Sequence, residues 1–392
     1  MRVRLGEICT VVSGTTPKST HPEYWGGDLN WVTPAELTDE SDVIYESQRK
    51  ITQQAVIDSS LKAFPVGTVL LSSRAPIGKV AIAGIEMYCN QGFKNLICSE
   101  KIYNRYLYHF LRDKTVFLNS LGRGATFKEI SKSIVEDIEI PLPSLDEQRK
   151  IAAVLDKVSD LIAKRRRQLG KLDELVKSQF VEMFGDPVVN SMGVDTQPMT
   201  ELCEIIDGDR GKNYPMTDEF SDKGYCLFLN AKNVTSQGFN FDTCLFVTKE
   251  KDEALRKGKL IRGDVVLTTR GTLGNLAFYT EEIPYEHVRI NSGMVILRMK
   301  QDMIDEVYFI EQFKMQLAEI KEKIASGSAQ PQLPISAMNK IQMIVPNLEK
   351  QKQFAAFVTL TDKSKAAIQK SMKNLETLKK SLMQTYFGGE NE

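Results

Sequence analysis

Two arginines occupy the same place in a repeated stretch and are the first candidates for chemistry. Residues 64–82 match residues 260–278 at an offset of 196, with six of nineteen positions identical, and Arg74 is equivalent to Arg270. Each arginine follows a Ser-Ser or Thr-Thr pair and precedes a glycine turn. An arginine in such a loop can bind a phosphate or a guanine edge, and it can equally brace its own domain.

Other polar residues near glycine turns could contact a phosphate backbone. The candidates in the first half are Gly14, Thr15, Thr16, Lys18, Lys79, Arg123 and Lys128, and those in the second half are Arg210, Lys212, Lys232 and Asn275. Lys79 aligns with Asn275, and Arg123 and Lys128 lie in the loop 122–128. These positions are hypotheses for backbone contacts.

Residues that bind metals or catalyse reactions form no recognisable motif. The six cysteines include no C-x-x-C pair and the chain has three histidines, which predicts reduced, buried thiols and no structural zinc. The P-loop, G-x-G-x-x-G, H-E-x-x-H and G-x-S-x-G motifs are absent. Pro-Pro does not occur, which excludes the Asn-Pro-Pro-aromatic loop of adenine methyltransferases. Glu319 and Lys321 could be half of a nuclease motif, but a charged helical stretch favours a solvated face.

Composition and charge are those of a globular protein. Fifty-one Lys and Arg balance fifty-one Asp and Glu, and 42% of the 392 residues are hydrophobic. Residues 186–346 carry eighteen basic and twenty-three acidic groups, so any binding to nucleic acid must be local. No apolar run is long enough to span a bilayer and no signal peptide is recognisable, which predicts a cytoplasmic protein without membrane contact.

The repeat continues along the chain and defines its organisation. Residues 5–14 match 199–208, and 143–185 match 346–388 without gaps at an offset of 203, with twelve of forty-three residues identical. Strands are predicted at 66–71, 80–83, 265–269 and 295–299, and helices at 103–118 and 303–324. The fold class is therefore mixed α/β, with two repeated globular domains.

Each repeat closes with a long helix carrying a heptad pattern. A helix from Glu147 to Phe184, about 57 Å long, is predicted by the lack of internal proline and by the stop Gly185-Asp186-Pro187. Apolar residues recur with alternating spacings of four and three, as in a coiled coil. The predicted seam consists of Val158, Ile162, Leu169, Leu172 and Val176, and of Ile368, Met372, Leu375, Leu378 and Leu382. Arg165 also falls on this seam, which favours a packing or partner contact for the cluster 165–167 over a contact with phosphate.

The order and repetition of these segments resemble the specificity subunits of type I restriction-modification systems. The resemblance rests on Ser13-Gly-Thr-Thr-Pro17, on 141–148 entering the first helix, on 183–187 leaving it, and on 325–333 and 346–351 before the second helix. The second half departs from the pattern at 207–210 and 349–350.

The resemblance implies a domain plan. It comprises a target-recognition domain (1–143), a spacer helix (144–185), a linker (186–198), a second target-recognition domain (199–346) and a second spacer helix (347–388). The two spacer helices pack antiparallel as a coiled coil, and the halves are related by a pseudo-two-fold axis.

The implied function is a non-catalytic reader of double-stranded DNA with a bipartite, asymmetric target. The partners would be two methyltransferase subunits and, in restriction complexes, two motor-nuclease subunits. No cofactor is expected on this chain, because S-adenosylmethionine would bind the methyltransferase, and ATP and Mg²⁺ the motor-nuclease. A methylation-only or type II-like system and a coiled-coil adaptor without DNA readout are the alternatives.

Overall fold

The structure is a computed structural model that describes residues 2–38, 40–74, 76–123, 128–325 and 332–388, without the side chains of 323–325. The chain divides into two compact units, which are described separately. Unit 1 comprises residues 1–166 and 370–392, and unit 2 comprises residues 167–369. Each unit therefore contains half of each long helix. Parts of two predicted loop segments, 124–127 and 326–331, lie outside the described residues.

Unit 1 is built around a five-stranded sheet of order β2-β9-β6-β7-β4. The residues that alternate inward on this sheet are apolar, and Val69, Leu71, Ile82 and Leu96 are buried together. A three-stranded sheet (β5-β3-β8) and the pair β1-β10 complete the strands. The strands are β1 (Arg2–Arg4), β2 (Cys9–Ser13), β3 (Trp25–Val32), β4 (Val43–Ile44), β5 (Lys50–Ile51), β6 (Val69–Leu71), β7 (Val80–Ala83), β8 (Tyr88–Cys89), β9 (Lys94–Cys98) and β10 (Glu139–Pro141).

The helices of unit 1 are α1 (Leu5–Ile8), α2 (Gln53–Asp58), α3 (Asn104–Asp113), α4 (Thr115–Leu121), α5 (Lys132–Glu136), the first half of α6 (Leu145–Phe184) and the second half of α11 (Leu348–Phe387), with 3₁₀ turns at Pro22–Tyr24 and Pro34–Glu36. Helices α1, α3 and α5 pack against the five-stranded sheet, and α2 packs against the three-stranded sheet. The single helix predicted at 103–118 is two helices that meet at Lys114. At the break, the Thr115 hydroxyl donates to the carbonyls of Arg112 and Gly78, which anchors the start of α4 to the turn between β6 and β7.

Unit 2 repeats this plan with a four-stranded sheet of order β12-β20-β17-β18. Beside it are a three-stranded sheet (β16-β13-β19) and the pairs β11-β21 and β14-β15. The strands are β11 (Thr196–Pro198), β12 (Cys203–Asp207), β13 (Cys226–Leu229), β14 (Val234–Thr235), β15 (Gly238–Phe239), β16 (Phe246–Val247), β17 (Val265–Thr268), β18 (Leu276–Phe278), β19 (Val288–Ile290), β20 (Met294–Met299) and β21 (Gln342–Ile344).

The helices of unit 2 are the second half of α6, α7 (Met199–Leu202), α8 (Lys249–Ala254), α9 (Glu306–Ala325), α10 (Ile335–Met338) and the first half of α11 (Leu348–Phe387), with a 3₁₀ turn at Thr217–Glu219. The mixed α/β fold and its duplication confirm the sequence prediction. The last three residues of the predicted linker 186–198 form β11, which pairs with β21 and so belongs to unit 2.

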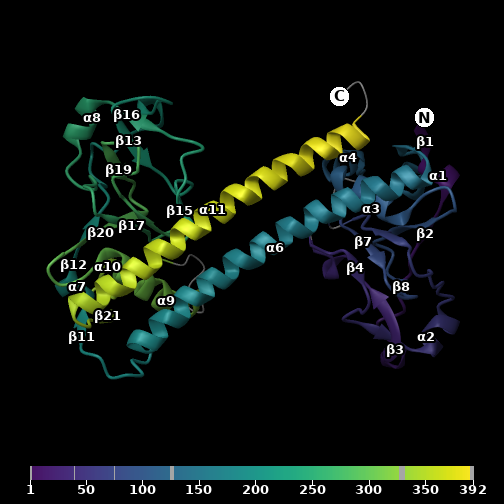
Figure 1. Ribbon diagram of the computed structural model, residues 1–392, viewed down its shortest axis with the longest axis horizontal. Helices are drawn as coiled ribbons and strands as arrows, with labels where there is room; N and C mark the ends of the chain where they lie inside the picture. The colour runs from purple at the N-terminus through teal and green to yellow at the C-terminus, as the bar shows by residue number, and fades with distance from the viewer. Residues whose placement is uncertain (1, 39, 75, 124–127, 326–331, 389–392) are drawn as a thin grey trace. The chain divides into compact units, whose positions relative to one another are not determined.

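The long helices α6 and α11 each contain 40 residues and are drawn in teal and yellow in Figure 1. Their ends enter the cores. In unit 1, Ile151 and Leu155 of α6 pack in the same cluster as Met383 and Phe387 of α11. In unit 2, Val176, Phe180 and Phe184 of α6 pack with Phe354 and Val358 of α11. Because the start of α6 and the end of α11 share one core, the two helices run antiparallel within each unit. None of the helices in the described part of the chain is long and apolar enough to cross a bilayer.

Candidate nucleic-acid interface

The two repeated arginines stand on turns with the same hydrogen-bond frame. In unit 1, the Ser72 hydroxyl accepts from the backbone N–H of Lys79 (2.8 Å), and Gly78 N–H donates to the Ser72 carbonyl (3.0 Å). In unit 2, the Thr268 hydroxyl accepts from Asn275 N–H (2.9 Å), and Gly274 N–H donates to the Thr268 carbonyl (2.8 Å). Gly78 (φ +93°) and Gly274 (φ +80°) adopt the left-handed conformation that favours glycine.

Two further segments meet this turn in each unit. Ser73 and Thr269, the residues just before the arginines, donate through their N–H groups to the carbonyls of Gly92 and Gly293, both at 2.8 Å. Their own carbonyls accept from the N–H groups of Ile130 (3.0 Å) and Leu333 (3.1 Å). The two units therefore present Arg74 and Arg270 from equivalent three-segment surfaces.

A glycine directly after β2, and the equivalent glycine directly after β12, allow a fourth segment to approach. A Cβ atom on Gly14 would lie 2.1 Å from the Cys89 carbonyl oxygen, and one on the equivalent Gly208 would lie 2.2 Å from the Asn291 carbonyl oxygen. These glycines are needed for close packing of the backbone. The neighbouring Thr15 and Thr16 are exposed, and the Thr16 hydroxyl bonds to the side chain of Gln91.

The surroundings of the two arginines differ. An Arg74 Nη1 atom lies 3.9 Å from Glu129 Oε2, and the Arg74 side chain is 35% exposed. Arg270 is exposed, and within the described residues it forms no ion pair. Arg74 and Arg270 thus occupy equivalent positions but have different electrostatic environments.

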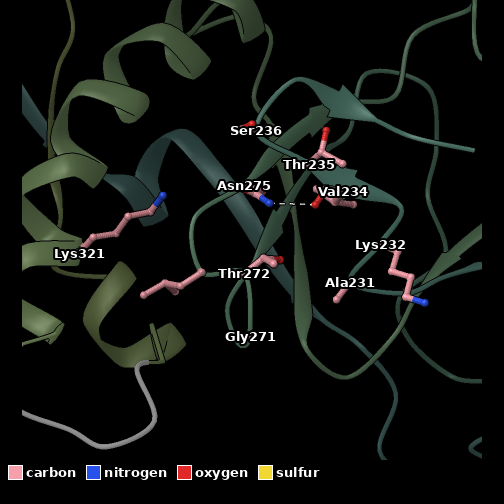
Figure 2. A pocket seen from close by; sticks show the side chains of 10 residues that line it. Ala231, Lys232, Val234, Thr235, Ser236, Gly271, Thr272, Asn275 and Lys321 are labelled. Atoms are coloured by element: carbon pink, nitrogen blue, oxygen red, sulfur yellow. Dashed lines mark hydrogen bonds between the residues drawn. The ribbon is translucent and has the colours of Figure 1, made fainter. Parts of the chain in front are cut away.

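The side chains of two other aligned candidates donate hydrogen bonds to backbone carbonyls within their own unit. The Lys79 ammonium donates to the carbonyls of Pro34 (3.4 Å) and Leu37. Asn275 Nδ2 donates to the Val234 carbonyl at 3.0 Å, as Figure 2 shows. These bonds favour a structural role for Lys79 and Asn275, because each ties its turn to the strand or loop beside it.

The remaining candidates are at the surface. Lys18, Arg123, Lys128, Lys212 and Lys232 are exposed. Arg210 is also exposed, and one of its Nη atoms lies 3.2 Å from both Asp207 Oδ1 and the Ser292 carbonyl. An exposed lysine or arginine can exchange water for a phosphate oxygen without a large desolvation cost.

Unit 2 has a cavity of about 740 Å³ beside the Arg270 turn. Figure 2 shows the turn residues Gly271 and Thr272 along it, with the side chains of Lys321 and Lys232 on opposite sides. The Lys321 stem passes over the turn, since a Cβ atom on Gly274 would lie 2.2 Å from Lys321 Cε. Sequence reasoning assigned Lys321 to a solvated helix face. The contact joins Lys321 of α9 to a turn glycine that lies more than forty residues earlier in the chain, so no local pattern could reveal it.

The facing sides of the long helices follow the predicted heptad spacing. Between residues 164 and 179, the residues that are not exposed are Arg165, Leu169, Leu172, Val176 and Gln179. On α11, half-buried Ile368, Met372, Leu375 and Leu382 continue a stripe that begins at Thr361 and Lys365. Val158 and Ile162 are buried.

The assignment of Leu378 to the seam was wrong. Leu378 is 46% exposed, and the half-buried position of that turn is Lys379. The alternating heptad spacing requires the next seam position to be four residues after Leu375, which is Lys379. The apolar Leu378 lies only three residues after Leu375 and therefore falls outside the seam. Burial, followed by the charges of Arg112 and Arg166, lowers the pKa of Lys379.

A charged cluster holds α3 against α6 in unit 1. His109, which is 2% exposed, hydrogen-bonds through Nε2 to Asp156 Oδ1 (2.7 Å), and Arg105 bonds to the same carboxylate and to Asp42 (2.6 Å). Burial is the main cause that lowers the pKa of His109, and the hydrogen bond and charge of Asp156 oppose it. Burial opposes ionisation of Asp156, but the hydrogen bonds and charges of His109 and Arg105 together outweigh it and lower the pKa of Asp156.

The described residues contain no disulfide and no cluster of metal ligands. All six cysteines are free, and burial is the main cause that raises the pKa of Cys89 and of Cys203 to about 12. Among the residues that the structure describes, no three His, Cys, Asp or Glu side chains gather as metal ligands.

Comparison with known proteins agrees with this arrangement. A family described as "Type I restriction modification DNA specificity domain" matches residues 1–171 and 193–378. The chain is 30% identical over 362 residues to the type I restriction enzyme MjaIX specificity subunit of Methanocaldococcus jannaschii, covering 88% of this chain and 82% of that protein. It is 28% identical over 183 residues to the EcoR124I/EcoR124II specificity subunit of Escherichia coli, covering 45% of each.

A solved structure has the same fold. The type I restriction-modification S subunit from M. genitalium aligns over 100% of this chain and 96% of its own, with a TM-score of 0.57 and 18% identity. The match of the family to both repeats, at 1–171 and 193–378, leads to one conclusion: this chain belongs to the type I restriction-modification DNA specificity family.

Proposed function

We propose that each unit reads one half of a bipartite, asymmetric DNA target through the surface around its repeated arginine. The observation that carries the proposal is the equivalent frame of Arg74 and Arg270, in which the same backbone bonds present two cationic side chains. The divergent neighbours, Glu129 beside Arg74 and the Lys321 cavity beside Arg270, favour two different half-sites.

The long helices act in this proposal as a spacer that fixes the distance between the half-sites. A 40-residue helix is roughly 60 Å long, which is about 1.7 turns of B-DNA. Their packing is supported by ion pairs on either side of the middle of the seam. Asp173 Oδ1 and Lys365 Nζ are 2.8 Å apart in unit 2, and Arg166 and Glu376 are 3.5 Å apart in unit 1.

Catalysis belongs to partner subunits in this proposal. Two methyltransferase subunits would dock on the chain, bring S-adenosylmethionine and methylate adenine in each strand. A motor-nuclease pair would add ATP- and Mg²⁺-dependent restriction, and a methylation-only system would lack it. Support comes from the family and from the near balance of charge, because unit 2 supplies little electrostatic attraction of its own.

The proposal is tested by coexpression with a type I methyltransferase subunit, followed by single-molecule sequencing of methylated adenines. We expect one motif with two different specific halves separated by a constant number of unspecified bases. A palindromic motif, or methylation independent of the chain, would contradict the proposal.

A further inference from the structure

Glu129 lies among three cationic residues of unit 1. Its Oε1 atom is 2.9 Å from Lys94 Nζ, and its Oε2 atom is 3.9 Å from an Nη atom of Arg74. Its backbone is directly opposite Arg74 on one side and Arg123 on the other, in isolated antiparallel bridges. Side chains opposite each other in this way share a face and interact. A single carboxylate therefore faces the candidate DNA-contacting arginine.

The second repeat has the same backbone positions without an equivalent of the Lys94–Glu129 ion pair. Arg270 is opposite Gln332, just as Arg74 is opposite Glu129. Ser13 pairs with Lys94 between β2 and β9, and the equivalent Asp207 pairs with Val295 between β12 and β20. The ion pair Lys94–Glu129 of unit 1 is thus replaced in unit 2 by the neutral pair Val295 and Gln332.

The need to neutralise the buried Lys94 ammonium explains only one of the two contacts that the Glu129 carboxylate makes. The Lys94 side chain is 9% exposed, and a buried ammonium needs a partner. One carboxylate oxygen satisfies that need. The other oxygen faces Arg74, and the Glu129 side chain is 38% exposed, so its charge acts on the surface as well as on the interior.

We infer that Glu129 is a specificity-determining positioning residue that directs Arg74 to a base edge. This inference rests on the function proposed above. A carboxylate 3.9 Å from the guanidinium attracts it by charge and repels phosphate, whereas the acceptor edge of guanine is neutral and is not repelled. Arg270 has a neutral opposite residue and, among the residues that the structure describes, no carboxylate partner, so we expect it to bind phosphate. Unit 1 then depends on its arginine for sequence discrimination, and unit 2 depends on its arginine for affinity.

Reciprocal variants in the complete chain, assembled with its methyltransferase subunits, test the inference. The measured quantities are the Kd for a cognate duplex, for duplexes with either half-site replaced, and for non-specific duplex, each at several salt concentrations. For Glu129→Gln we expect discrimination at the first half-site to fall by roughly five-fold or more. Non-specific binding should tighten, with a salt dependence steeper by about one unit. Discrimination at the second half-site should not change.

Gln332→Glu is the matched variant and should weaken non-specific binding with a shallower salt slope. The double variant Lys94→Val with Glu129→Gln reproduces the pair of unit 2 and controls for loss of the partner of Lys94. If it folds and has lost discrimination, the charge of Glu129 acts through Arg74. If it regains full discrimination, Glu129 serves only Lys94 and the inference is overturned.

Glu129→Asp keeps the charge and should retain weak non-specific binding. Arg74→Ala separates this inference from the proposed function. If Arg74→Ala reduces first half-site recognition and Glu129→Gln does not, only the role of Glu129 is wrong. If Arg74→Ala has no effect on any duplex, the proposed DNA-binding surface of unit 1 is wrong.

Discussion

Phe387, the last residue of α11, should contribute a large share of the stability of unit 1. It is fully buried, and its ring centroid lies 5.1 Å from that of Tyr106 and 5.5 Å from that of Phe110. Phe387→Ala removes a buried ring and both aromatic contacts. Comparable Phe→Ala changes cost about 3–5 kcal/mol, which for a unit of this size lowers Tm by roughly 6–20 °C.

The matched control is Leu378→Ala, on the same helix and 46% exposed. It should cost less than about 0.5 kcal/mol, because truncation of an exposed side chain leaves no cavity. Calorimetry and urea unfolding of both variants, with hydrogen exchange to locate the destabilised unit, measure the difference. Equal losses in the two variants, or opening confined to unit 2 in Phe387→Ala, would refute the packing described for the end of α11.

Three further outcomes follow from the helices and their charges. Lys379→Met should raise the unfolding free energy by about 1 kcal/mol, measured by urea unfolding, because burial already disfavours the ammonium; an unchanged or lower value would contradict this. The pKa values of His109 and Asp156 are both lowered in the folded state, so both groups stabilise the fold less as the pH falls. The loss from His109 begins below pH 6.5 and the loss from Asp156 begins below pH 3.8. In a pH series of Tm values, His109→Gln should reduce the loss that begins below pH 6.5. Residues 1–185 should dimerise with Phe184 of each copy in the place of Phe387, and with methyltransferase should modify a palindrome of the first half-site; methylation of the original asymmetric site would exclude that pairing.

The repeat and the long helices could be predicted because their signals are local. Glycine stops and the absence of proline predicted a first helix at 147–184, and the structure has 145–184. β7 lies exactly at the predicted residues 80–83. The register of the heptad follows from spacing alone, which is why choosing apolar Leu378 over Lys379 gave the wrong seam residue.

The interface could be predicted only in part because its contacts join distant segments. The alignment of Arg74 with Arg270 located the repeated turn. The alignment could not show that the Lys79 and Asn275 side chains donate to backbone carbonyls of their own units, because those carbonyls lie more than forty residues away along the chain. Glu129 was not singled out, since its relation to Arg74 appears only when the two backbone segments are paired.

The central claim is that each unit reads its own half-site through the surface around its repeated arginine. The most direct measurement is the Kd of Arg74→Ala and Arg270→Ala complexes for duplexes in which the first or the second half-site is replaced, with Tm as the folding control. We expect Arg74→Ala to lose about 1–3 kcal/mol of discrimination at the first half-site only. Arg270→Ala should weaken binding wherever unit 2 contacts DNA, with a salt slope shallower by about one unit. A large fall in Tm with unchanged Kd per folded molecule in both variants would show that the arginines brace their own domains and would contradict the claim.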